Sequence, residues 1–144
     1  MTVEKLRNEG LIEPISASLP KAVRGIRRAQ RDFSSAQIML PIDEEWTYTM
    51  AYHAMLRAGR ALMAADGYRP KGKAQHRTVV VYVGSRLGSR FRDLVSDFDR
   101  MRRKRHEFVY DFERPIPHQE AEQALKDAQD LVGAIASLIR PRRS

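Results

Sequence analysis

The apolar residues of this chain recur at intervals of three and four, in long segments separated by clusters of proline and glycine. This spacing lines up apolar side chains along one face of an α-helix. Long helices joined by short connections imply that neighbouring helices run antiparallel. The pattern therefore predicts an all-α fold, an antiparallel bundle of four to five helices.

Capping residues mark where the predicted helices begin and end. Pro20 suits the first turn of the first helix, Pro41 stops it, and Asp43 caps the second. Most of the acidic residues of the last helix lie in its N-terminal half, where they complement the helix dipole. The five predicted segments run from Pro20 to Leu40, from Asp43 to Gly67, from Ala74 to Leu87, from Ser89 to Pro115 and from Gln119 to Ile139.

The third segment contains a β-branched run, Thr78 to Val83, that propensity alone assigns to a strand. Its spacing favours a helix, because His76, Val80 and Leu87 fall on one helical face. A lone strand among helices would also lack a pairing partner. We therefore predict a helix here, with His76 as a hydrogen-bonded core histidine.

With 144 residues the chain fits one domain. We expect a single helical domain over residues 1–144, with a short leader (residues 1–19) and a basic tail (residues 140–144). Its longest apolar stretches, Val79–Val83 and Ala61–Ala65, fall far short of the roughly 18 residues that span a bilayer. No secretory signal is visible at the N-terminus. We therefore expect a cytoplasmic protein with no membrane partner.

Several chemistries are excluded by missing residues or motifs. Zero cysteines exclude disulfides, thiolate zinc sites and cysteine nucleophiles. The sequence has no Walker loop, no GxGxxG and no GxSxG. Its histidines form no HxH, HxxxH or HExxH pair, so neither a metal site nor a cofactor is predicted. They are His53, His76, His106 and His118.

The fourth segment carries a basic run in which one residue faces inward. On a helical wheel Arg105 lies near the centre of the apolar stripe, whereas His106 lies on its flank and Lys104 points away. Burying an arginine costs several kcal/mol unless it is paired. Two interpretations follow: a structural ion pair with a carboxylate on another helix, or a guanidinium presented to a phosphate.

Five fragments of the chain, in their order and spacing, resemble the HEPN domain family (higher eukaryotes and prokaryotes nucleotide-binding). They are Lys5–Ile12, Ala51–Leu56, Gly67–Pro70, His76 and Arg102–Asp111. The resemblance implies an HEPN-like helical bundle that is usually a homodimer. In active members an Arg-x(4 to 6)-His motif serves metal-independent RNA cleavage at a cleft between two protomers. Many toxin-type members are paired with a small nucleotidyltransferase-like antitoxin.

The motif can be placed on this chain in two registers. In the first, Arg105 is the motif arginine, His106 takes the following polar position, and Tyr110 stands where catalytic members have histidine. In the second, Arg100 pairs with His106, with five residues between them. We favour the first because Arg105 faces inward, and the candidate catalytic residues are then Arg105, His106 and Tyr110.

Cleavage through the ribose 2′-hydroxyl needs a base, an acid and a cation near the phosphorane. Arg105 supplies the cation, but a tyrosine with a reference pKa of about 10 is a poor base at neutral pH. The leading hypothesis is an HEPN-type RNA-binding protein that is a metal-independent endoribonuclease of a toxin–antitoxin or defence system. The alternative is a non-catalytic HEPN interaction module that binds RNA, nucleotide or a partner protein.

The positive charge of the chain also points to RNA. There are 26 lysines and arginines against 18 acidic residues, a formal net charge of +8, which favours polyanionic partners. We expect a basic surface whose RNA affinity falls steeply with salt; a merely solvated basic face is the alternative. Its residues are Arg102, Arg103 and Lys104, with Arg140, Arg142 and Arg143 of the tail.

Overall fold

The computed structural model describes residues 1–110 and 115–139, and the side chains of these except residues 108–110. The predicted basic tail therefore lies outside the described residues. Within them the chain forms, in order, α1 (Val3–Asn8), β1 (Ile12–Pro14), α2 (Leu19–Met39), α3 (Glu44–Asp66), β2 (Tyr68–Pro70), α4 (Gln75–Leu87), the 3₁₀ helix η1 (Ser89–Phe91), α5 (Arg92–Tyr110) and α6 (His118–Ile139).

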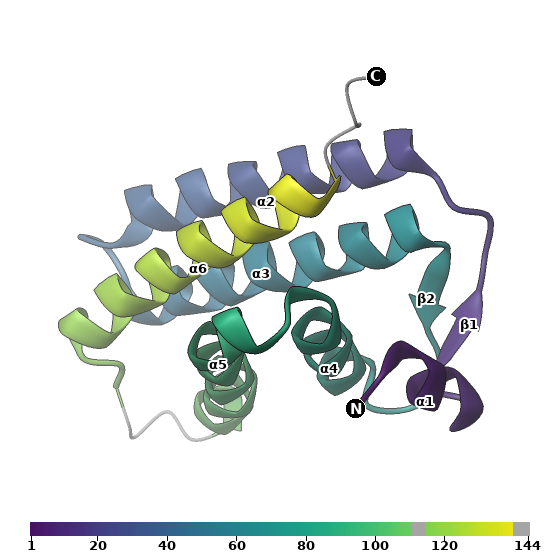
Figure 1. Ribbon diagram of the computed structural model, residues 1–144. Coiled ribbons are helices and arrows are strands. Elements are labelled where there is room, and N and C mark those ends of the chain that lie inside the picture. The colour runs from purple at the N-terminus through teal and green to yellow at the C-terminus, as the bar shows by residue number, and fades with distance from the viewer. Residues whose placement is uncertain (111–114, 140–144) are drawn as a thin grey trace.

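The predicted all-α bundle is confirmed, with α3 at its centre. Helices α2, α3 and α6 lie side by side along their lengths, and α4 and α5 cross them at a steep angle (Figure 1). Helix α3 contacts all four of the other long helices. Its buried face is rich in alanine and glycine, which lets neighbouring helices approach closely. The crossing of α4 and α5 is a departure from the purely antiparallel arrangement that we predicted.

The crossing of α4 over α3 depends on Gly59. A Cβ atom built on Gly59 would lie 2.5 Å from Cγ1 of Val79 and 3.0 Å from Cγ2 of Val83. Only a residue without a side chain allows α4 to lie this close. The β-branched residues of α4 are therefore buried against α3, and the predicted helix is confirmed because burial against a neighbouring helix outweighs β-propensity.

The short leader that we expected over residues 1–19 contains helix α1 and strand β1. Thr2 caps α1 by accepting a hydrogen bond from the backbone N–H of Lys5 at 3.1 Å, and Leu6 is completely buried. Strand β1 then pairs antiparallel with β2, with Ile12 opposite Pro70. A three-residue strand is too short to display an alternating pattern, and its partner is far along the chain. The sequence pattern therefore did not predict this helix and strand within residues 1–19.

The other helix boundaries lie close to their predicted positions. The Asp43 carboxylate accepts from the backbone N–H of Trp46 at 3.0 Å, as expected of the α3 cap, and Gly67 ends α3 in the left-handed conformation. Helix α6 begins at His118, one residue before the predicted start. Ser89 opens the 3₁₀ turn η1, so α5 itself begins only at Arg92.

An ion pair fastens α4 to the end of α3. Asp66 accepts hydrogen bonds from the Tyr82 hydroxyl at 2.5 Å and from Nε of Arg86 at 2.6 Å. Burial and the hydrogen bond to Asp66 raise the pKa of Tyr82, so its hydroxyl stays protonated and keeps donating. This contact holds α4 in place, and α4 in turn packs against α5.

We predict that Gly59→Ala lowers the free energy of unfolding by about 1–3 kcal/mol, because the added methyl must displace Val79 or move α4. Urea denaturation followed by circular dichroism measures this change. The matched control is Gly133→Ala on α6, where nothing lies within 4 Å of the added Cβ, and which we expect to stabilise the helix by about 0.5–1 kcal/mol. Equal effects of the two substitutions would contradict the close crossing.

Candidate functional site

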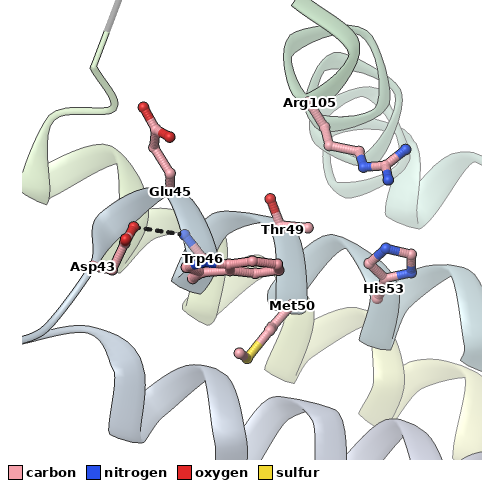
Figure 2. A pocket seen from close by; sticks show the side chains of 7 residues that line it. All are labelled: Asp43, Glu45, Trp46, Thr49, Met50, His53 and Arg105. Carbon is pink, nitrogen blue, oxygen red and sulfur yellow. Dashed lines mark hydrogen bonds between the residues drawn. The ribbon is translucent and has the colours of Figure 1, made fainter. Parts of the chain in front are cut away.

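A cavity of about 580 Å³ lies between α5 and the N-terminal half of α3. Four of its lining residues lie at helical spacing on a single face of α3: Trp46, Thr49, Met50 and His53. Arg105 reaches into the same space from α5 (Figure 2). The volume is within the range of roughly 300–1,000 Å³ typical of small-molecule sites. The lining residues are Asp43, Glu45, Trp46, Thr49, Met50, His53 and Arg105.

Arg105 is half-buried, as its position on the helical wheel led us to expect. Its Nε atom is buried and has no hydrogen-bond partner among the residues that the structure describes. Asp43 and Glu45 line the same cavity, but within the described residues neither forms an ion pair with Arg105. A buried donor left without an acceptor costs about 1–3 kcal/mol, and more when it is charged. The guanidinium is therefore suited to binding an anion that enters the cavity.

His53 lies beside Arg105 on the α3 side of the cavity (Figure 2). Burial lowers the pKa of His53 below its ordinary value, and the positive charge of Arg105 lowers it further. The imidazole is therefore neutral at physiological pH and able to accept a proton. The cavity thus combines an anion-binding cation with a neutral base.

We did not predict His53 as a site residue from the sequence. One available signal was its spacing, since His53 follows Trp46 by two helical turns and Thr49 by one on the same face of α3. That signal marks a face of α3 without saying which other helix it faces. Only the packing of α5 over this face brings Arg105 to it.

The other candidate catalytic residues lie elsewhere or outside the description. His106 is exposed and does not line the cavity. Tyr110 is the last residue of α5, and its side chain lies outside the described part of the structure. Arg100 is exposed and forms an ion pair with Asp97 at 3.2 Å. The register built on Arg100 and His106 thus brings neither residue to the cavity, whereas the other register brings Arg105.

The predicted basic surface is largely paired with carboxylates. Arg102 and Arg103 both contact Asp99, at 2.9 and 3.4 Å, and Lys104 pairs with Glu120 of α6. Arg103 remains the most exposed of the three cations, with 63% of its side chain accessible. The basic run of α5 therefore carries less free charge than its sequence suggests.

Tyr52, the neighbour of His53 on α3, is held by a second histidine. The Tyr52 hydroxyl and Nδ1 of His76 form a hydrogen bond of 3.0 Å, and the Tyr52 ring packs against Phe98 of α5. Burial raises the pKa of Tyr52 to about 12, and burial lowers the pKa of His76, so both groups are neutral. His76 is hydrogen-bonded as the sequence predicted, but it is only half-buried and not part of the core, and it links α4 to α3.

A family model described as the HEPN domain matches residues 22–138 of the chain. The chain belongs to the HEPN domain family. The matched region includes every residue that lines the cavity. No curated protein and no solved structure matches the chain.

The described residues of this HEPN chain contain neither a metal-binding cluster nor a membrane-spanning helix. Among them no three histidine or acidic side chains are grouped so that they could hold a metal ion. No helix within the same residues is long and apolar enough to cross a membrane.

We predict that the imidazole of His53 titrates below 6.5 and that Arg105→Ala raises this pKa. The substitution removes a positive charge that disfavours the protonated ring, so the pKa must move up toward the ordinary value. Histidine ring signals followed by NMR as the pH is varied give both values. Arg103→Ala is the control, because Arg103 is not among the groups that shift His53. An unchanged pKa in the Arg105 variant would contradict the proximity of the two residues.

Proposed function

We propose that this HEPN protein binds RNA through Arg105 and cleaves it without a metal ion. The observation that carries the proposal is the pairing, in one cavity, of a buried guanidinium Nε that lacks a partner among the described residues with a neutral imidazole. A phosphodiester supplies the oxygen that Nε lacks, and the adjacent 2′-hydroxyl supplies a proton for the imidazole. Family membership supports RNA as the substrate class.

In the proposed reaction His53 takes the proton of the 2′-hydroxyl, and the 2′ oxygen forms a bond to the neighbouring phosphorus. The bond from phosphorus to the 5′ oxygen breaks, leaving a 2′,3′-cyclic phosphate and a 5′-hydroxyl end. Arg105 stabilises the negative charge that develops on the phosphorane. The leaving oxygen receives a proton from an acid, for which Tyr110 at the end of α5 is the candidate, because His106 does not line the cavity.

His53 is a better candidate for the base than His106 or Tyr110. Its lowered pKa keeps the imidazole unprotonated at neutral pH, and it lies in the same cavity as Arg105. His106 does not line that cavity. Tyrosine is protonated at neutral pH and hence a poor base.

The proposal includes the partners that the family resemblance implies. Active HEPN members work as homodimers with the motif helix at a cleft between protomers, so we propose that α5 faces a second copy of this chain. A nucleotidyltransferase-like antitoxin is proposed as a second partner, which would make the protein the toxin of a toxin–antitoxin or defence system. Co-expression followed by size-exclusion chromatography tests both associations.

The test of the activity is incubation of the pure protein with single-stranded RNA in EDTA. We predict products ending in 2′,3′-cyclic phosphate, and a loss of rate of about 100-fold or more in His53→Asn and in Arg105→Ala. His118→Asn is the matched control, because His118 is exposed at the start of α6 and lies outside the cavity.

Two outcomes would contradict the enzymatic proposal. RNA binding without any cleavage product in the wild type would identify the alternative, a non-catalytic interaction module. Cleavage that survives in Arg105→Ala would assign the activity to another site or to a contaminant.

We further propose that Arg102, Arg103 and Lys104 bind RNA phosphates outside the cavity. Reversing the charge of Arg102 and Arg103 together is predicted to weaken RNA binding and to flatten its salt dependence, by roughly 0.7 in the log–log slope for each lost phosphate contact. Fluorescence anisotropy at several salt concentrations measures the slope. The control reverses Arg24 and Arg27 of α2, which changes the net charge equally. An equal slope change in both variants would show that only the net charge matters, and would contradict specific phosphate contacts by the basic run.

A further inference from the structure

Trp46 is a large aromatic residue that lines the cavity with much of its surface uncovered. It is the only tryptophan in the chain, and 57% of its surface is exposed. Its position is fixed by the cap of α3, since its backbone N–H donates to Asp43. Burying an aromatic ring is strongly favourable, and an indole beside a binding cavity is well suited to stacking against a flat ligand. Figure 2 shows the ring between the acidic end of the cavity and the end that holds Arg105 and His53.

The two ends of the cavity carry opposite charges. Arg105 enters at one end, and the carboxylates of Asp43 and Glu45 line the other. A second anionic group is repelled from the acidic end, whereas a neutral ring with N–H donors is accepted there. The ligand that fits this arrangement carries its negative charge at one end and a flat, neutral, hydrogen-bonding ring at the other.

The spacing along α3 matches one nucleotide. Trp46 and His53, which lies beside Arg105, are separated by about two turns of helix, an axial rise of about 10.5 Å at 1.5 Å per residue. This is the length scale of a nucleotide from its phosphate to the outer edge of its base. Thr49 lies between the two on the same face and presents a hydroxyl to the middle of the cavity.

From these three observations we infer that the cavity holds one unpaired nucleotide of an RNA strand, with its phosphate at Arg105 and its base stacked on Trp46. The inference rests on the proposed function and names the substrate class of that site: single-stranded rather than duplex RNA. A base inside a helix has both faces covered by its neighbours, so it cannot stack on Trp46 unless it is unpaired and turned out.

The single tryptophan makes the stacking directly measurable. The emission of Trp46 is followed while the full-length protein is titrated with a short single-stranded oligoadenylate whose riboses are 2′-O-methylated to prevent cleavage. We expect saturable quenching, because a base stacks on the indole. Inorganic phosphate, which reaches Arg105 without a base, is expected to leave the emission unchanged. A duplex of the same length is expected to cause no quenching.

Substitutions at position 46 test the contribution of the ring to binding, measured by anisotropy of a labelled oligoadenylate. Trp46→Ala is expected to weaken binding by roughly 10-fold or more, and Trp46→Phe, which keeps an aromatic face, to restore most of it. Ile38→Ala is the matched control, because Ile38 is an exposed apolar residue, 70% accessible, that does not line the cavity. Since Trp46 is itself exposed, none of these variants removes a core contact.

The outcomes separate this inference from the proposed function. If Arg105→Ala abolishes binding while Trp46→Ala binds normally, the phosphate site stands and the stacking is overturned. If Arg105→Ala binds normally, the proposed function itself fails. Emission that changes with protein concentration but not with RNA would assign Trp46 to a contact between copies of the chain, and would overturn the inference as well.

Discussion

The packing of small residues on α3 is the constraint on which the rest of this structure depends. Gly59 allows the close approach of α4, and a Cβ atom on Gly25 of α2 would lie 2.9 Å from Cβ of Ala61, so α2 also packs closely on α3. Interiors are packed nearly as densely as organic crystals, and one extra methyl at such a contact moves a whole helix. Each of the other long helices is therefore positioned by its contact with α3. The cavity lies on the remaining face of α3. These helix contacts therefore determine the shape of the cavity.

The properties of the site follow from where α5 crosses that face. Phe98 and Met101 of α5 are buried, and Arg105 continues the same inward stripe beyond them. The guanidinium is thereby carried into partly desolvated surroundings, where an electrostatic contact is stronger than in water. The same surroundings keep His53 neutral. One helix crossing thus produces both the cation and the base.

Periodicity and capping residues were sufficient to predict the long helices, including α4 with its β-branched run. They did not predict β1 and β2, because pairing between two three-residue strands depends on a distant part of the chain. The wheel also placed Arg105 inward, since a helical stripe is a local property. His53 and Trp46 were not predicted as site residues, because they line a cavity only when α5 packs over α3. The periodicity of each helix does not determine the angle at which the two helices cross.

Helix α3 has a core face and a cavity face, and residues on the two faces can be substituted independently. One face holds the large core residues Tyr48, Tyr52 and Met55, all essentially inaccessible to solvent, and the other holds Trp46, Thr49 and His53 of the cavity. Substitutions on the cavity face remove few core contacts, so their cost in stability is small. Related chains can therefore diverge in what they bind by altering a few positions at helical spacing on α3, while the same hydrophobic core keeps the bundle folded.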